Sequence, residues 1–399
     1  MKWDTIRFGD LYAEDSRNGL TKPSKVRGSG YKMINMGELF ANDRIYDIPM
    51  ELVPLKENEK KNAKVECGDL LFARQSLVLE GAGKCSIVME TAPLTVFESH
   101  LIRVRLERKK ANPLFYYYYF KSPYSGVKTI VSQCAQAGIR GSDLQEIVVI
   151  HPDIHLQDAI AEYLSRYDDL IENNQRQIKL LEEAAKRLYK EWFVDLRFPG
   201  YGDVEINDGV PKRWKQSTLE EICILSKKVI PANDIVSGIP YIGLEHMPRR
   251  DFCLSEWGDS SEINSNKFEY RENDILFGKI RPYFHKVGFA INDGYASTDS
   301  IIMKAKDGLW GLLLMLTTSD EFVDYTYQTC KEGAKMPRAD WNQMKKYPVL
   351  IADEALQRNF EVKCRAMANK IKALAFQIRM LIEARDRLLP KLMSGEIEL

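Results

Sequence analysis

The sequence lacks the features that mark several common classes of protein. Its 57 basic residues are balanced by 57 acidic ones, and no segment forms the basic tail that many nucleic-acid-binding chains carry. The longest apolar run, Leu309 to Leu316, is much shorter than the ~20 residues that span a bilayer. No charged and then apolar leader opens the chain. We therefore expect a cytoplasmic protein that makes no membrane contact.

Metal, disulfide and nucleotide motifs are also missing. The seven cysteines show no C-x-x-C spacing, which favours free thiols in a reducing compartment. His151 and His155 are four residues apart, but a proline lies between them and no cysteine is near, so no zinc site is expected. The run from Gly81 to Lys84 is not a P-loop, because Val78 replaces the first glycine and Cys85 the required hydroxyl.

The sequence does contain an internal repeat, which is clearest in a helical segment that recurs 200 positions later. The recurring residues are Ile178, Leu181, Glu183, Ala184, Arg187 and Leu188, matched by Ile378, Leu381, Glu383, Ala384, Arg387 and Leu388. The globular parts repeat less closely, as when Gly68 to Arg74 returns as Asn273 to Lys279. So long a period predicts two complete domain-plus-helix units rather than a solenoid.

Two segments carry a heptad pattern of core positions, from 156 to 192 and from 360 to 392. This spacing predicts two helices that pack together as a coiled coil, a rod of roughly 55 to 60 Å. Asn174 aligns with Leu374 in the repeat, and a polar seam residue of this kind commonly fixes register. The expected interface residues are Ile171, Asn174, Ile178, Leu181, Leu188, Ile371, Leu374, Ile378, Leu381 and Leu388.

Short β-rich runs with glycine and asparagine turns fill the rest of each half, so the fold class is α/β (α+β) with a pseudo-two-fold repeat. Residues 113–120 read as a helix, and 54–66 as an exposed loop. Tyr116 to Tyr119 favour a helix that packs its aromatics on a sheet over a base-stacking platform. The predicted segments are a first domain 1–152, a central helix 153–198, a second domain 199–352 and a C-terminal helix 353–399.

Several motifs resemble those of the specificity (S) subunits of type I restriction-modification systems. The most specific are the run from Gln157 through Asp168-Asp169 to Trp192-Phe193 and the run from Leu388 to Ile397. The Gly-Asp-Leu-Leu-Phe-Ala-Arg strand and the turns at Asp143-Leu144 and Asp340-Trp341 fit less specifically. The resemblance covers essentially the whole chain.

The resemblance implies two target recognition domains, each reading one half of a split double-stranded DNA site, separated by two antiparallel helices. It also implies assembly with two methyltransferase (M) subunits and, for cleavage, with restriction (R) subunits. Neither a methyltransferase glycine-rich loop with an Asn/Asp-Pro-Pro-aromatic motif nor a P-loop occurs in this sequence. We therefore expect no catalysis and no cofactor in this chain, with S-adenosylmethionine held by the M subunits and ATP and Mg by the R subunits.

Direct readout of bases favours Arg or Lys for guanine and Asn or Gln for adenine, presented from loops on a rigid platform. The DNA-binding candidates are Arg74, Gln75, Lys84, Gln136 and Arg140 in the first domain, and Lys279, Arg281, Lys286, Lys335 and Arg338 in the second. The acidic residues Asp168, Asp169, Glu172, Glu182 and Glu183 lie largely off the seam. They are expected either to meet an M subunit or to form a solvated face.

Two alternative functions stay open at the level of sequence. The near-zero net charge is compatible with a protein-binding scaffold in which duplicated domains on a coiled coil bind no DNA. An S-like decoy that has lost its modifying partners is the other. The whole-length repeat and the run from Leu388 to Ile397 favour the DNA-specificity function over both.

Overall fold

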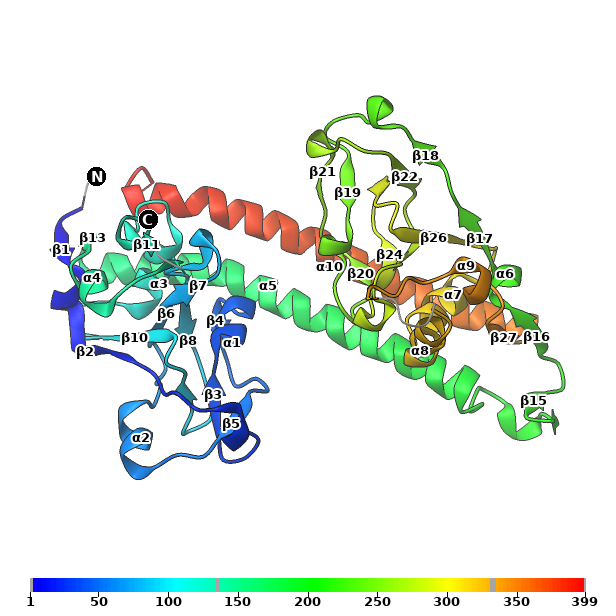
Figure 1. Ribbon diagram of the computed structural model, residues 1–399, viewed down its shortest axis with the longest axis horizontal. Helices are drawn as coiled ribbons and strands as arrows, with labels where there is room; N and C mark the ends of the chain where they lie inside the picture. Colours follow the sequence, from blue (N-terminus) through cyan, green and yellow to red (C-terminus); the bar gives the residue numbers. More distant parts are fainter. Residues whose placement is uncertain (1–2, 134–136, 331–334, 398–399) are drawn as a thin grey trace. The chain divides into compact units, whose positions relative to one another are not determined.

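The computed structural model describes residues 3–133, 137–330 and 335–397, which form two compact units (Figure 1). The first unit contains residues 1–169 and 381–399, and the second contains 170–380. The boundaries cut through both long helices, so each unit holds one part of each helix. The four-segment division expected from the sequence stays a prediction.

A five-stranded sheet forms the centre of the first unit. Its order is β2 (Tyr12–Asn18), β10 (Leu101–Leu106), β6 (Leu70–Ala73), β8 (Cys85–Val88) and β4 (Arg44–Ile45). All neighbours are antiparallel except β4 and β8, which are parallel. Leu70 and Phe72 point into one core, and Leu71 and Ala73 into another. Burial on both faces explains why the central strand β6 is apolar throughout rather than alternating.

Smaller elements complete the first unit. The sheets are β5 (Glu51–Val53), β3 (Tyr31–Ile34) and β9 (Val96–Phe97); β11 (Ser132–Gln133), β12 (Ala137–Gly138) and β7 (Gln75–Ser76); and β1 (Thr5–Arg7) with β13 (Val148–Ile150). The helices are α1 (Met36–Ala41), α2 (Glu57–Asn62), α3 (Pro113–Lys121) and α4 (Gly141–Gln145). The sequence prediction of a loop over 54–66 is wrong in part, because α2 forms there and Ala63 and Val65 after it are buried.

Helix α3 confirms the helix predicted over 113–120. The Asn112 side chain accepts hydrogen bonds from the amides of Leu114 and Phe115, and Pro113 occupies the first helical turn. All four tyrosines from Tyr116 to Tyr119 are buried. They belong to the same core cluster as Leu70 and Phe72 of the central sheet. The prediction that these rings pack on a sheet is therefore confirmed.

The second unit repeats this architecture. Its central sheet has the order β17 (Cys223–Ser226), β26 (Ser300–Ala305), β23 (Ile275–Gly278), β24 (Val287–Ala290) and β20 (Cys253–Leu254). The strand directions match one for one, including the parallel pair at the β20 edge. Strand β16 (Lys215–Thr218) pairs with β27 (Pro348–Ile351), as β1 pairs with β13. The internal repeat predicted from the sequence is thus present in the fold.

The two copies differ mainly in their second sheet. In the second unit it has five strands in the order β18 (Val229–Ile230), β22 (Lys267–Tyr270), β25 (Gly294–Ala296), β19 (Pro240–Ile242) and β21 (Gly258–Asp259). The remaining elements are the hairpin β14 (Ile206–Asn207) and β15 (Val210–Pro211), and helices α6 (Leu219–Ile222), α7 (Trp310–Thr317), α8 (Asp320–Gln328) and α9 (Trp341–Met344). Insertions of this kind explain why the globular parts repeat less closely in the sequence than the helices do.

The long helices are α5 (Ile154–Tyr189), which ends in a π turn over Lys190–Val194, and α10 (Glu354–Ser394). In the first unit Ile160 and Leu164 of α5 share a core with Leu389 and Leu392 of α10. In the second, the ring centroids of Trp192 and Phe360 lie 5.8 Å apart. The start of α5 thus packs with the end of α10 in the first unit, and the segment that ends α5 packs with the start of α10 in the second. This is the antiparallel arrangement expected.

Candidate nucleic-acid interface

Some of the predicted seam residues are buried, and the rest of the predicted interface stays a prediction. Ile171, Ile371 and Leu374 are buried, and Asn174 is buried too. The Asn174 side chain donates a hydrogen bond of 3.4 Å to Gln377, a polar pair inside an apolar seam. The remaining predicted interface residues, all partly buried, are Ile178, Leu181, Leu188, Ile378, Leu381 and Leu388.

Two of the acidic residues placed off the seam are not on a solvated face. Asp168 is buried in the first unit, where it accepts hydrogen bonds from Arg385 at 2.5 Å and from the Tyr118 hydroxyl at 2.7 Å. Glu182 is buried in the second unit and accepts hydrogen bonds from the amides of Phe252 and Cys253. Both expectations of an exposed acid are wrong, because heptad spacing marks apolar positions and does not show which acid has a buried partner.

The basic candidates Arg74 and Lys279 occupy equivalent positions in the two copies. Each follows the central strand, and each donates its amide to a carbonyl before the neighbouring strand, Arg74 to His100 and Lys279 to Asp299, both at 2.8 Å. Their side chains also repeat one another, because Arg74 bonds to the Ser99 carbonyl and Lys279 to the Thr298 carbonyl. Burial lowers the pKa of Lys279.

A second equivalent pair, Lys84 and Lys286, closes the loop that joins the two central strands in each copy. The Lys84 ammonium donates to the Phe40 carbonyl at 2.9 Å, and the Lys286 ammonium donates to the Leu244 carbonyl at 2.5 Å. Because both copies make the same bond, these lysines hold the loop against the helical segment that follows β3 in the first unit and β19 in the second. DNA contact by either lysine stays a prediction.

The other candidates lie around these loops. Gln75 is in β7, and Arg140 is exposed directly before α4. Arg281 has a left-handed backbone with φ of 52°, a conformation that non-glycine residues rarely adopt and that is often found at functional sites. Lys335 is exposed. Gln136 lies outside the described residues.

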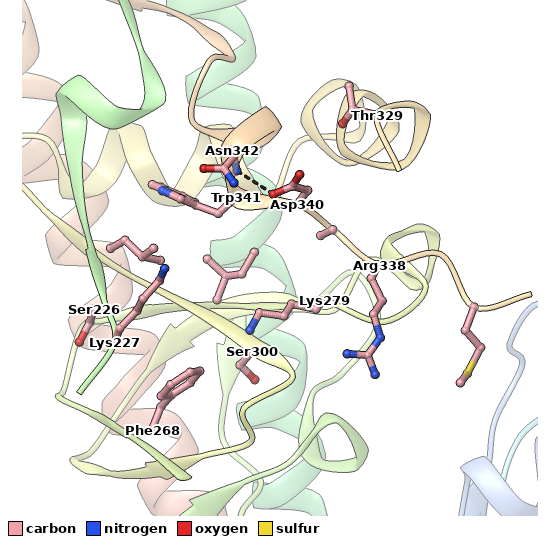
Figure 2. Close-up of a pocket in the computed structure, with 14 residues that line it drawn as sticks. Ser226, Lys227, Phe268, Lys279, Ser300, Thr329, Arg338, Asp340, Trp341 and Asn342 are labelled. Carbon is pink, nitrogen blue, oxygen red and sulfur yellow. Dashed lines mark hydrogen bonds between the residues drawn. The ribbon is translucent and has the colours of Figure 1, made fainter. Parts of the chain in front are cut away.

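Arg338 and Lys279 meet at a cleft of about 530 Å³ in the second unit (Figure 2). The cleft combines cations with aromatic rings, since Lys227, Phe268 and Trp341 also line it. The Arg338 side chain is 57% exposed and pairs with Asp299 at 3.0 Å, and the Lys279 ammonium lies 5.3 Å from the centre of the Phe268 ring. Cations beside flat rings suit a phosphate and an adjacent base.

Sequence reasoning missed several residues of this cleft. Lys227 follows β17, Phe268 belongs to β22, and Asn342 lies in the first turn of α9, so no local motif joins them. The Asp340 carboxylate accepts a hydrogen bond of 2.9 Å from the Asn342 amide in that turn (Figure 2). The sequence pointed to this cleft through Lys279, Arg338 and the Asp340-Trp341 turn.

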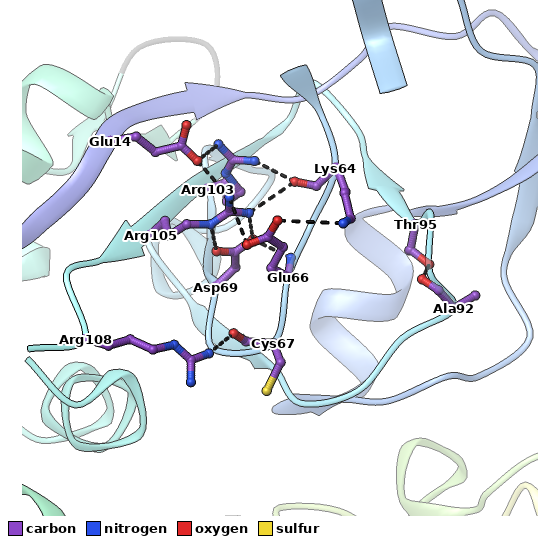
Figure 3. A network of polar contacts seen from close by, with 10 residues as sticks. All are labelled: Glu14, Lys64, Glu66, Cys67, Asp69, Ala92, Thr95, Arg103, Arg105 and Arg108. Atoms are coloured by element: carbon purple, nitrogen blue, oxygen red, sulfur yellow. Dashed lines mark hydrogen bonds and ion pairs between the residues drawn. The ribbon is translucent and has the colours of Figure 1, made fainter. Parts of the chain in front are cut away.

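A buried polar network takes up two other arginines of the first unit (Figure 3). Arg105 forms two bonds of 2.7 Å to Asp69, whose side chain is 1% exposed, and these bonds raise the pKa of Arg105. Arg103, which is buried, donates to Glu14 and to the Lys64 carbonyl. Both guanidinium groups are paired with partners within the domain, so these arginines are not candidates for DNA.

No group of three or more His, Cys, Asp or Glu residues able to hold a metal ion occurs in the described part of the chain. The His151 ring lies 2.9 Å from the Tyr116 hydroxyl, and burial lowers its pKa. The six described cysteines are free thiols, and Cys134 lies outside the described residues. Among the described helices none is long and apolar enough to cross a membrane.

Comparison with known proteins places this geometry in a family context. Residues 1–183 match the family model of the type I restriction modification DNA specificity domain. The MjaIX specificity subunit of Methanocaldococcus jannaschii is 24% identical over 99% of this chain and 93% of its own. The chain is similar to type I restriction specificity subunits over its whole length.

Two further relatives agree with this. The EcoKI specificity subunit of Escherichia coli is 29% identical over 42% of this chain and 37% of its own. The crystal structure of the type I restriction-modification S subunit of M. genitalium aligns with a TM-score of 0.58 over 98% of this chain and 96% of its own, at 16% identity. The resemblance and the fold class of a specificity subunit, drawn from the sequence, are confirmed.

Proposed function

We propose that the chain is the DNA specificity subunit of a type I restriction-modification complex and recognises a bipartite, asymmetric site. The observation that carries this is the repeat itself: the same strand order presents the same loop, with Arg74 and Lys84 in one copy and Lys279 and Lys286 in the other. Two divergent copies of one platform suit two different half-sites read by one chain.

In this role the chain recognises DNA and does not itself catalyse a reaction. Two methyltransferase subunits would act on an adenine in each half-site, which they must flip out to modify. Restriction subunits would join for cleavage. S-adenosylmethionine would be held by the methyltransferase partners, ATP and Mg by the restriction partners, and none of them by this chain. We place the complex in the cytoplasm, where the DNA is.

In the second domain we assign DNA contact to the cleft of Figure 2. Arg338 is the side chain to test, because its single surface ion pair with Asp299 contributes little to stability. We expect Arg338→Ala to weaken binding to all duplexes and to lower the slope of log K against log salt by about 1. Arg271→Ala is the matched control, since Arg271 is 62% exposed and also holds surface ion pairs.

The proposal is tested by co-expressing the chain with a type I methyltransferase subunit from the same genome and mapping N6-methyladenine by single-molecule sequencing. A split motif with one methylated adenine in each half supports the specificity function. A complex that forms but methylates no motif favours a scaffold or a decoy. Failure to form any complex contradicts the assembly.

A further inference from the structure

The loop between the two central strands of the first unit exposes three consecutive apolar side chains. Leu77 is 88% exposed, Val78 58% and Leu79 45%, and Leu77 is the most exposed large apolar side chain among the described residues. Single exposed leucines are common on protein surfaces, but a contiguous apolar tip is typical of a binding surface.

Hydrogen bonds to the backbone hold the tip in one conformation. The Val78 amide donates to the Ser76 hydroxyl at 3.2 Å, and the Gly81 amide donates to the Val78 carbonyl at 3.2 Å. The Lys128 ammonium donates to the carbonyls of Glu80 and Ala82, the first at 2.7 Å. These bonds hold part of the loop backbone in place while Leu77 and Leu79 are exposed. A partner therefore meets a preformed apolar surface, and little conformational entropy is lost on binding.

The equivalent loop of the second unit has the same design with a different residue. Between β23 and β24 the chain makes a single 3-10 turn over Pro282–Phe284, and Tyr283 at its tip is 45% exposed. Arg281 and His285 on either side both have left-handed backbones, with φ of 52° and 55°. Such strained conformations persist only where the surroundings hold them, and they cluster at functional sites. An exposed apolar tip at one position in both copies is therefore a feature of the platform.

The surroundings of each tip favour DNA as the occupant. Arg74, Lys128 and Arg140 lie in or beside the first loop, whose strand β7 pairs with β12, the strand that leads to Arg140. In the second unit Arg249 and Arg281 stack on the Phe284 ring next to Tyr283. A duplex has apolar stacked bases between two negatively charged phosphate backbones. An apolar tip with cations beside it is complementary to that surface.

We propose that Leu77, at the tip of loop 74–84, inserts as an apolar wedge between base pairs of the half-site bound by the first domain, and that Tyr283 does the same in the second. This inference rests on the proposed function and specifies how the DNA is read. The wedge unstacks one base step, and the cost of unstacking depends on sequence, being lowest at pyrimidine–purine steps. Part of the specificity would then come from base steps that no polar side chain contacts.

The test uses the complex of the full chain with its methyltransferase and duplexes that carry the mapped motif, with 2-aminopurine placed at each position in turn. With the unchanged chain we expect bright 2-aminopurine at one step of the first half-site. Leu77→Ala should abolish that signal and weaken binding about 10- to 100-fold, the loss expected for one buried leucine. Leu77→Met should retain most of both, and the salt slope should stay unchanged.

Two internal controls separate the possible causes. The adenine flipped by the methyltransferase gives its own 2-aminopurine signal, which should persist in Leu77→Ala. Val148→Ala removes an apolar side chain that is 63% exposed on β13 of the same unit, and it should change affinity less than twofold. Tyr283→Ala should abolish a corresponding signal in the other half-site only.

Three results would overturn the wedge. If Leu77→Ala binds within twofold of the unchanged chain and leaves every 2-aminopurine signal in place, the loop does not enter the duplex while the specificity function stands. If Leu77→Ala loses its methyltransferase partner, the tip is a protein interface. If the unchanged complex binds no duplex specifically, the wedge and the proposed function fail together.

Discussion

The buried pair of Asp168 and Arg385 offers a sharp test of how α10 is fixed to the first domain. The two side chains are 6% and 13% exposed, and the Tyr118 hydroxyl completes the cluster. Burial acts to lower the pKa of Arg385, but the charge and hydrogen bond of Asp168 outweigh it and raise that pKa. The guanidinium therefore stays charged and needs its partner.

The repeat supplies a natural control for this pair. At an offset of 200 positions, Asp168 corresponds to Ala368 and Arg385 to Ala185, and both alanines are buried in the second unit. The equivalent positions thus hold an ion pair in the first unit and two alanines of one buried cluster in the second. Replacing both charged residues by alanine gives the first unit the residues that the second already has at these positions.

We expect Asp168→Ala alone to cost about 3–5 kcal/mol, because it leaves a charged guanidinium buried without a counter-ion. Tyr118→Phe should cost about 1.5–3 kcal/mol, the range for a hydrogen bond to a charged group. The double variant Asp168→Ala/Arg385→Ala should be no less stable than either single variant. Because the double variant then loses no more than either single variant, the coupling free energy between the two positions is at least as large as the larger single loss, about 3–5 kcal/mol.

Because the chain has two units, its unfolding is not a single two-state transition, and a global midpoint would mix them. Hydrogen exchange of the amides in residues 381–394 measures the opening of this helix end directly. We expect faster exchange there in Asp168→Ala and recovery in the double variant. If the two single losses simply add in the double variant, Asp168 and Arg385 are not coupled.

Two further predictions concern buried ionisable groups, and both are checked by hydrogen exchange of the amides in the unit that holds the group. Arg103 is matched in the second copy by Ile302, so Arg103→Ile should change stability by only about 1 kcal/mol. Arg105→Ala should cost about 3–5 kcal/mol, because the buried Asp69 carboxylate loses its ion-pair partner. Equal losses in the two variants would contradict this prediction. Burial, and secondarily Asp251, raise the pKa of Glu182 to about 7, so the folded chain holds an extra proton and loses stability as pH rises from about 4.5 to 7. Glu182→Gln keeps an oxygen for both backbone amides and should be up to about 3 kcal/mol more stable than the unchanged chain above pH 7; an unchanged pH profile would contradict it.

The parts of the fold that depend on local pattern were predictable from the sequence. The α5–α10 pair follows from a seam that repeats every seven residues, and the central strands from apolar runs such as Leu70–Ala73. The fixed offset between the helices revealed the duplication before any strand pairing was known. Helix α2 was missed because its sequence is almost wholly charged, and its helix is supported by a capping bond between Glu59 and the Lys56 amide.

The candidate site was harder to predict, because its geometry comes from contacts distant in sequence. Lys84 and Lys286 were identified by residue type, but their bonds to Phe40 and Leu244 are tertiary. The burial of Asp168 depends on Arg385, which is far away along the chain. Charge and period alone do not distinguish a basic residue that faces solvent from one that closes a loop.

If each copy reads its own half of one DNA site, exchanging one copy should change only that half. Residues 201–350 are replaced by the corresponding domain of another type I specificity subunit, and N6-methyladenine is mapped in cells that also make the methyltransferase. We expect one half of the methylated motif to change while the other half and its adenine stay the same. A motif altered in both halves would show that the two copies do not read DNA independently.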